Sequence, residues 1–371
     1  MTRHRPAPGP PPDADALRAI GLAAGLDVVE VAGAAPFAEV RDELLRRRAE
    51  GLHGGMAFTY RNPERSTTPE LSLPDARALV VAARCYRTEA DPEPGPGPQG
   101  RVARYAWIDH YGELRAGLRA VAEALLDAGW RARVLVDDNA LVDRAVAHRA
   151  GLGWFGKNAN LLLPGKGSWF VLGSVLTDAP LPSTGTEVPD RCGTCTRCIT
   201  ACPTGAIVAP GVVDARRCLA WLLQATGPFP REHRGALGDR IYGCDDCQDV
   251  CPPNRRSPAR PRRGDEVAWV PLLELLRDDD DVVMALAGRW YIPQRDPRYV
   301  RRNALVALGN VGDGSDRAVA EALERHLRHA DPLLRAHAVW AARRLGREDL
   351  VAPLADDPDP LVREELDAPA P

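Results

Sequence analysis

The feature that most constrains this chain is a run of cysteines near the middle of its sequence. Four cysteines and a proline follow one another with the spacing C-x2-C-x2-C-x3-C-P, at Cys192, Cys195, Cys198 and Cys202. In bacterial ferredoxins, three thiolates of such a run hold one [4Fe-4S] cluster and the fourth reaches a second cluster. This long and specific spacing predicts a two-cluster domain of the bacterial ferredoxin type.

A second cysteine run lies farther along the chain. It reads C-x2-C-x3-C-P, which is the same order without its first cysteine. If the two runs exchange ligands as in ferredoxins, the second cluster lacks one thiolate. Cys218 lies between the runs, where a chain reversal could deliver it. The expected ligands are Cys192, Cys195, Cys198 and Cys251 for the first cluster, and Cys202, Cys218, Cys244 and Cys247 for the second.

Other interpretations of these cysteines are weaker. Zinc prefers tetrahedral sites built from paired C-x2-C units, which do not explain the x2-x2-x3-Pro order. Disulfides are rare in a reducing cytoplasm. The ninth cysteine, Cys85, lies in an apolar stretch and is expected to be a small buried side chain. The chain is therefore expected to relay single electrons through two clusters.

Length and composition indicate a cytoplasmic protein of several domains. The chain has 371 residues, and at about 100–200 residues per domain two or three domains are expected. Its first residues are rich in proline without an apolar h-region, and no stretch of roughly 18 apolar residues follows. We expect residues 1–13 to be disordered, no membrane partner, and a monomer.

The N-terminal part, from residue 14 to 180, is expected to be an α/β domain. Helix-type patterns alternate there with short β-type apolar runs, which is typical of a layered architecture with a covered sheet. A proline- and glycine-rich segment at 91–100 is expected to be a loop inside this domain. Helices are expected at 40–50, 114–128 and 141–150, and strands at 78–86, 132–138 and 168–177.

Two proline-rich strips divide the rest of the chain. The strip at 178–190 separates the first domain from a ferredoxin-like domain at 181–258. The strip at 255–263 is expected to be a linker. Beyond it, residues 265–371 have a helical pattern and form the last predicted domain.

The helical part contains a repeated unit. Asp-Pro, one or two apolar residues, an arginine and a helix-forming run recur from Asp296, Asp331 and Asp359. Units of this size stack as a solenoid, because each buries its apolar face on the next. Two or three HEAT-like repeats are expected; an ordinary helical bundle with coincidental Asp-Pro caps is the alternative.

The densest unusual sequence outside the cysteines is the segment 136–173. Gly151, Gly153 and Gly156 allow the backbone to approach a ligand closely, and Trp154 offers a flat face beside them. A loose G-x-G-x-x-G is weak on its own. Here it follows a helix, which argues against a dinucleotide-binding fingerprint.

Several motifs together resemble the epoxyqueuosine reductase family. They are VD at 136–137, DR at 143–144, AGLGWFGKN at 150–158, GSWF at 167–170, the first cysteine run, and IYGCDDCQDVCPPN at 241–254. The resemblance implies an α/β cobalamin-binding domain, an adjacent cluster that supplies its electrons, and a tRNA anticodon stem-loop as substrate. The implied activity is reduction of the epoxide of epoxyqueuosine to queuosine, the last step of queuosine biosynthesis.

The resemblance also implies a proton donor. Asp137 matches the aspartate of the family's VD motif, seven residues before Arg144. A proton is needed because opening an epoxide leaves an alkoxide, and the oxygen leaves as water only once protonated; the cobalt supplies the hard chemistry. Alternatively, Asp137 caps the helix expected at 141–150, although Asp138 or Asn139 could serve as that cap.

Cofactor contacts are implied for a further set of residues. For Gly156, Lys157 and Asn158 the resemblance implies contacts to the corrin or its nucleotide tail, and a tight turn with a solvated lysine is the alternative. Arg144 could instead be a surface arginine. The expected cobalamin contacts are Arg144, Trp154, Gly156, Lys157, Asn158 and Ser168.

The sequence departs from the family pattern in a few places. The proline expected in the VD segment is Ala140, its following glutamate is Asp143, and the tryptophan expected in CPWN is Pro253. The family's WGxDYH element reads WIDHYGEL, around Trp107–Tyr111. None of these changes removes a cluster ligand or Asp137, so we expect the chemistry to be kept and the substrate pocket to differ.

Two alternative functions use the same residues. One is a reductive dehalogenase-like cobalamin enzyme acting on a small molecule, and the other is a simple iron–sulfur electron carrier. The repeats favour the tRNA enzyme, because an arginine-bearing solenoid offers an extended surface to a nucleic-acid backbone. With a net charge of only −3, RNA contacts must use local patches such as 255–263. The sequence does not identify the electron donor.

Overall fold

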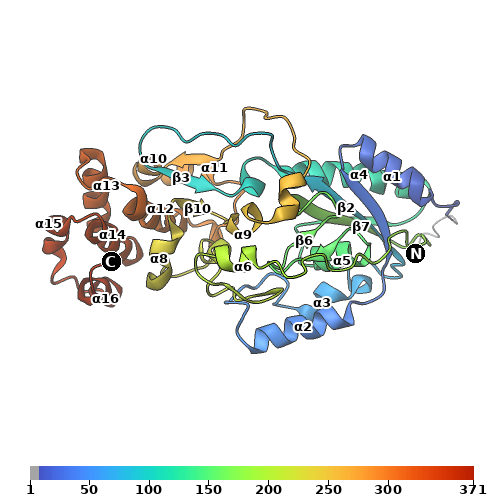
Figure 1. The fold of residues 1–371 in the computed structure, drawn as a ribbon, viewed down its shortest axis with the longest axis horizontal. Helices are drawn as coiled ribbons and strands as arrows, with labels where there is room; N and C mark the ends of the chain where they lie inside the picture. Colours follow the sequence, from blue (N-terminus) through green and yellow to red (C-terminus); the bar gives the residue numbers. More distant parts are fainter. Residues whose placement is uncertain (1–7) are drawn as a thin grey trace, which may run out of the picture.

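The computed structural model describes residues 8–371 of the chain. Three parts lie in a row: a sheet domain at one end, the cysteine region in the middle, and a stack of helices at the other end (Figure 1). The parts follow one another in the predicted order along the chain.

The N-terminal domain is built on a four-stranded sheet in the order β1-β2-β7-β4. All neighbouring strands pair antiparallel. The apolar runs predicted β2, β4 and β7, but they carry no information on strand direction, and β1 was not predicted. The bounds are Val28–Gly33 for β1, Ala78–Cys85 for β2, Ala132–Val136 for β4 and Phe170–Thr177 for β7.

Helices cover both faces of this sheet, as the alternating pattern predicts (Figure 1). On one face α4 presents a buried apolar stripe that includes Leu114, Leu118 and Leu125 and packs together with α1. On the other face lies α5. The bounds are Ala14–Ala23 for α1, Ala38–Ala49 for α2, Pro63–Thr67 for α3, His110–Asp127 for α4 and Asp143–Arg149 for α5.

The cysteine region consists of short helices and turns. Helix α6, which contains Cys198, packs against α9, which contains Cys247, so the two cysteine runs are brought together. A small hairpin and two further helices complete the region. The bounds are Arg197–Ala201 for α6, Ile207–Ala209 for β8, Val212–Val213 for β9, Leu219–Leu222 for α7, Arg231–Leu237 for α8 and Asp246–Asp249 for α9.

The C-terminal helices stack as the repeats predict. Helix α14 packs between α12 and α16. The recurring Asp-Pro has a local cause, because Asp331 and Asp359 each accept a hydrogen bond from a backbone N–H of the first turn, at 2.9 Å. The bounds are Leu272–Arg277 for α10, Asp280–Leu286 for α11, Arg298–Val311 for α12, Arg317–Leu327 for α13, Pro332–Arg344 for α14, Glu348–Val351 for α15 and Pro360–Asp367 for α16.

One short strand joins all three parts, which the sequence did not predict. The segment 91–100 was expected to be a loop inside the first domain, but it ends in β3 (Gln99–Val102). This strand pairs with β10 (Arg240–Tyr242) from the cysteine region and with β11 (Trp269–Pro271) beyond it. A strand of this length has too few residues to show a period.

The proline-rich strips are also attached to the first domain. Thr184 of the strip at 178–190 exchanges hydrogen bonds with the backbone of Val31 at the sheet edge. Arg260 of the presumed linker at 255–263 bonds to the Cys85 carbonyl, at 3.0 Å. That strip is therefore a packed segment rather than a free linker.

The disordered N-terminus predicted for residues 1–13 needs a partial correction. Residues 1–7 lie outside the described residues. Beyond them, the Gly9 amide donates to the Ala128 carbonyl at 3.0 Å, and Asp13 caps α1. These bonds attach residues 9 and 13 to the sheet domain.

Candidate functional site

Four cysteines form a first group where α6 meets α9. Burial raises the pKa of the Cys251 thiol to about 11, and the other three thiols of the group raise it further. Burial likewise raises the pKa of Cys198. Such thiols become thiolates only when a cation compensates the lost hydration. The group consists of Cys192, Cys195, Cys198 and Cys251.

Four other cysteines form a second, more deeply set group. Burial raises the pKa of Cys244 to about 12 and that of Cys247 well above its usual range. Cys218, which directly precedes α7, raises the pKa of both. It also interacts with Cys202, so all four thiols belong together. The group is thus the set that the spacing predicts for the second cluster.

Among the described residues, the thiols do not form a site for a single metal ion. Within residues 8–371, no three Cys, His, Asp or Glu side chains lie close enough to share a single ion. A zinc ion holds its sulfur ligands at about 2.3 Å, so its thiolates must nearly touch. The Ala206 amide donates to the Cys202 sulfur at 3.2 Å, a kind of bond that tunes cluster ligands.

Cys85 stays outside both groups, as expected. It is fully buried in β2, and its thiol donates to the Pro258 carbonyl at 3.2 Å. Burial raises its pKa. These contacts are those of a structural side chain.

Asp137 lies directly after β4, at the rim of the sheet. Its backbone is left-handed, with φ of 51°, a conformation that aspartate tolerates better than most residues. The side chain is accessible to solvent, yet burial raises its pKa above 3.8, against the opposing effect of Arg115. The carboxyl is thus exposed, yet close enough to protein atoms for burial to raise its pKa. We refer to its surroundings, from Asp137 to Cys218, as the recess.

The alternative role of Asp137 as a helix cap is not what the structure shows. Helix α5 begins at Asp143, and its N-cap residue Val142 makes no side-chain capping bond. The nearby turn is held by Asp138, whose carboxylate accepts from the Ala140 amide at 2.8 Å. The Asp137 carboxyl therefore does not cap the helix.

The recess continues from Asp137 to the second cysteine group. Burial, Asp137 and Asp143 together raise the pKa of Tyr111, so these three side chains are near enough to interact electrostatically. Arg144 interacts with the same tyrosine and lowers the pKa of Cys218. Its guanidinium also donates to the Ala159 carbonyl at 2.6 Å. One wall thus connects a carboxyl, a phenol, an arginine and a thiol of the second group.

The turn at 156–158 sits against the cysteine region. Lys157 donates to the Gly193 carbonyl at 2.6 Å, and Asn158 to the Cys247 carbonyl at 3.3 Å. The Gly156 amide donates to the Asn160 carbonyl, which closes a tight turn. The side chains of this turn therefore bond to backbone carbonyls next to or within both cysteine groups.

Two glycines upstream approach protein backbone, not open space. A Cβ on Gly151 would meet the Thr186 carbonyl oxygen at 2.5 Å, and one on Gly153 would meet that of Leu162 at 2.1 Å. The close approach expected of these glycines is thus made to the chain itself.

Trp154 and Ser168 differ in how their polar atoms are satisfied. The Trp154 indole N–H is buried and has no hydrogen-bond partner within residues 8–371. Ser168 is buried and bonded to Asn254 and Gln248, at 2.6–3.2 Å. The first arrangement leaves a donor available to a ligand, whereas the second links the sheet domain to the cysteine region.

The altered segment Trp107–Tyr111 turns only one side chain to the recess. The Trp107 indole donates to the Val102 carbonyl at 2.7 Å, and Asp109 caps α4. His110 is buried, which lowers its pKa to about 4. Tyr111 alone faces Asp137.

Sequence reasoning missed two further tyrosines of this region. Tyr242 interacts with Asp137, and its ring lies 6.1 Å from that of Tyr105. Tyr242 directly follows the isoleucine of the second-run motif, which was the available signal.

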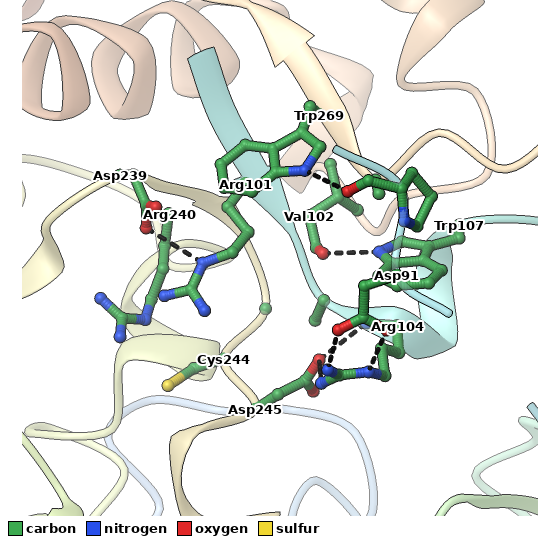
Figure 2. A pocket seen from close by; sticks show the side chains of 14 residues that line it. Asp91, Arg101, Val102, Arg104, Trp107, Asp239, Arg240, Cys244, Asp245 and Trp269 are labelled. Atoms are coloured by element: carbon green, nitrogen blue, oxygen red, sulfur yellow. Dashed lines mark hydrogen bonds and ion pairs between the residues drawn. The ribbon is translucent and has the colours of Figure 1, made fainter. Parts of the chain in front are cut away.

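A separate cavity of about 210 Å³ lies beside Cys244 at the three-stranded sheet. Figure 2 shows Arg101 directed at Asp239 and Arg104 directed at Asp91. Arg104 bonds to Asp249 at 2.6 Å, and its backbone N–H donates to Asp245 at 2.8 Å. Arg101 bonds to Asp239 at 3.0 Å. These charges are paired within the protein. The cavity lies where the three domains meet, since its lining residues come from each of them.

Two family profiles match parts of the chain. Residues 191–254 match the profile described as 4Fe-4S double cluster binding domain, and residues 291–368 match HEAT repeats. Both lie where the cysteine spacing and the Asp-Pro units predicted these folds. The predicted fold class is thereby confirmed. Within the described residues, no helix is long and apolar enough to cross a membrane.

Whole-chain comparisons agree with one another. An epoxyqueuosine reductase of Bacillus cereus is 33% identical over 336 residues, covering 87% of this chain and 86% of the relative. One of Xanthomonas campestris is 35% identical over 361 residues, 91% of this chain and 98% of the relative.

Solved structures give the same result. A crystal structure of epoxyqueuosine reductase with an epoxyqueuosine-modified tRNA-Tyr stem loop has a TM-score of 0.86 and 30% identity, and covers 95% of this chain and 96% of its own. The Streptococcus thermophilus structure has a TM-score of 0.84 and 28% identity, with 94% and 96% covered. Since identity, coverage and fold agree along nearly the whole length, the chain belongs to the epoxyqueuosine reductase family.

Proposed function

We propose that this protein reduces the epoxide of epoxyqueuosine to queuosine in the anticodon loop of tRNA. The observation that carries the proposal is the series of electrostatic interactions from Asp137 through Tyr111 and Arg144 to Cys218, which would bring a proton donor and an electron source to one site. Family membership supplies the reaction. As tRNA modification takes place where tRNA is made and used, the proposed location is the cytoplasm.

Two [4Fe-4S] clusters would be held by the two thiol groups. Burial raises the pKa of five of these thiols, and residues 191–254 match a double-cluster domain, which fits a cluster in each group. The second group borders the recess through Cys218, and the first lies beside exposed arginines such as Arg191 and Arg197. Electrons would therefore pass from the first cluster to the second.

The recess fits a cobalamin. Its wall is polar, open to solvent and adjacent to the second thiol group, and the Trp154 indole N–H is left without an acceptor. Arg144, Gly156, Lys157 and Asn158 would hold the cofactor from the side of the cysteine region. Ser168 is proposed for the same role; like Lys157 and Asn158 it also bonds within the protein, to Asn254 and Gln248. When bound, cobalamin supplies a strongly reducing and nucleophilic cobalt.

Asp137 would hold and deliver the proton. Conversion of the epoxide to an alkene breaks two C–O bonds, consumes two electrons and two protons, and releases water. Burial raises the pKa of this carboxyl and so favours its protonated, donating form. Asp143 and Tyr111, which face it, would help to keep the proton at the recess.

The electron donor is proposed to be an acidic carrier protein. Arg191, Arg197, Arg255 and Arg256 are exposed and lie within five positions of a cysteine of the first group. None of them forms an ion pair within residues 8–371. Unpaired positive charge beside a surface-exposed redox centre attracts a negatively charged partner.

The two alternative functions predict different behaviour. A dehalogenase-like enzyme would act on a small organohalide without tRNA, and a simple carrier would bind no cobalamin. Stacked repeats beyond the catalytic domain are superfluous for a small substrate but useful for tRNA.

The test is anaerobic reconstitution with iron, sulfide and cobalamin, followed by epoxyqueuosine-containing tRNA and a strong reductant. Nucleoside mass spectrometry is expected to show queuosine. Reconstituted protein that carries both clusters and cobalamin yet makes no queuosine would refute the proposal. Turnover of an organohalide in that same sample would favour the dehalogenase-like function.

A further inference from the structure

A short loop between α11 and α12 has an unusual exposed aromatic residue. The Tyr291 side chain is 59% exposed, more than most large apolar side chains of the described chain. Its neighbour Trp290 is 5% exposed and stacks on Tyr242, with ring centroids 4.7 Å apart. Trp290 therefore anchors the loop, and Tyr291 points away from the core.

The loop is also held in a strained conformation. Gln294 and Arg295 have φ of 55° and 58°, in the left-handed region that residues with a Cβ rarely adopt. The Arg295 guanidinium bonds to the carbonyls of Gly288 and Trp290, both at 3.2 Å, which closes the loop on itself. Backbone strain of this kind is kept where the surrounding structure enforces it, often at ligand contacts.

The loop borders the recess. The Tyr291 amide donates to the Tyr242 hydroxyl at 2.8 Å, and the Tyr242 ring lies 6.1 Å from that of Tyr105. Tyr242 also interacts electrostatically with the Asp137 carboxylate. Tyr291 is thus one hydrogen bond away from a residue that faces the proposed proton donor.

The loop carries positive charge that the protein does not neutralise. Arg289 donates to the Trp107 carbonyl at 3.0 Å, and Arg295 bonds only to carbonyls of its own loop. Neither forms an ion pair within residues 8–371. Both residues are exposed, so their remaining N–H groups are available to an anion.

We propose that Tyr291 stacks on a nucleobase of the anticodon loop beside the base being reduced, and that Arg289 and Arg295 contact its phosphates. An exposed aromatic ring next to unpaired arginines is the arrangement by which proteins hold unpaired RNA bases. This inference rests on the proposed function for its choice of RNA, and it assigns the contact to a loop outside the repeats and outside the segment 255–263.

The test measures RNA binding separately from catalysis. A fluorescent anticodon stem-loop without epoxyqueuosine is titrated with the reconstituted holoenzyme by anisotropy. Tyr291→Ala is expected to raise Kd roughly tenfold, because one stacked base is lost. Tyr291→Phe keeps the ring and is expected to bind like the unchanged protein.

Arginine variants test the phosphate contacts. Arg295→Gln is expected to reduce the slope of log K against log salt concentration by about 1, since one counterion fewer is released. Leu286→Ala, on exposed α11, and Arg317→Gln, on α13, are matched controls that should leave Kd unchanged. Thermal unfolding is expected to be the same for both Tyr291 variants and both controls, while Arg295→Gln also loses two hydrogen bonds within the loop.

The outcomes separate this inference from the proposed function. Tyr291→Ala that binds the stem-loop as tightly as the unchanged protein overturns the inference, whatever the activity. Loss of RNA binding in that variant supports it, even if no queuosine forms in any sample. If the loop instead binds a protein, a pull-down will depend on Tyr291 while RNA affinity does not, which also overturns it.

Discussion

The two cysteine groups have the same ligand chemistry but opposite surroundings. Near Cys244 and Cys247 of the second group the arginines are paired: Arg104 with Asp249, and Arg240 with Asp246, both at 2.6 Å. Around the first group four exposed arginines have no ion-pair partner among the described residues. The contrast arises from position, because the second group lies at the junction of three domains and the first lies near the surface.

The difference shows how one ligand type can serve two purposes. A cluster in a paired, buried site has a fixed environment, and hydrogen bonds and exposure set its potential. A cluster under a positively charged surface is accessible to a partner. If electrons enter beside the unpaired arginines, as proposed, they would pass from the first group to the second and then to the recess.

The largest effect is expected from Cys218→Ser, which removes a ligand of the second group only. The iron content should fall from about eight to about four per chain, since one of two [4Fe-4S] clusters is lost. Queuosine formation should stop, because electrons no longer reach the recess. Iron analysis and electron paramagnetic resonance would measure this, with Cys85→Ala as the matched control that keeps about eight irons.

A Cys218→Ser protein that kept both clusters would show that the eighth ligand comes from elsewhere. That result would also mean that the second cluster does not approach the recess through Cys218.

Asp137→Asn should lower kcat at least about hundredfold, because general acid catalysis contributes that much or more. Both clusters should remain, since the residue contacts no cysteine. The neighbouring variant Asp138→Asn is the control: its side-chain oxygen still accepts from the Ala140 amide, so turnover should be nearly unchanged. Equal losses in both variants would indicate a structural role for the turn.

The pH dependence follows from the raised pKa of Asp137. The donor works when protonated, so kcat should fall as the pH rises through its folded pKa, which lies above 3.8. The same carboxyl stabilises the fold below its unfolded pKa and loses that contribution as the pH rises through the folded pKa. Asp137→Asn should remove this fall in kcat with rising pH.

Arg104→Gln tests the ion pairs near the second cysteine group. The side chain is 18% exposed and bonds to Asp91 and Asp249, so its loss should cost about 2–3 kcal/mol of unfolding free energy. Urea unfolding would measure it. Arg277→Gln, at an exposed pair with Asp278, should change stability by less than about 1 kcal/mol.

The smallest effect is expected on the unpaired side, from Arg197→Gln combined with Arg255→Gln and Arg256→Gln. Stability and the rate with dithionite should stay unchanged. The rate with an acidic carrier protein should fall about tenfold at low salt and converge with the unchanged protein at high salt. Equal rates at every salt concentration would place the donor on another surface.

Local spacing predicted which thiols of the two runs lie together, since few residues separate them, whereas Cys218 was chosen as the nearest remaining thiol. The helix caps at Asp331 and Asp359 were predictable because capping also depends on residues close together in the sequence. Contacts between distant segments were not, because β3 pairs with residues far along the chain. Tyr291 was missed as well, since a single exposed aromatic residue has no pattern until Tyr242 is placed beside it.

The three-stranded sheet has a mechanical consequence. Because β3, β10 and β11 come from the three parts of the chain, backbone hydrogen bonds hold those parts in register. The redox centres then need no moving domain to carry electrons. The distance between the second thiol group and the recess is fixed when the chain folds. A cut or insertion within 91–100 should therefore slow electron delivery even if every ligand and every recess side chain is kept.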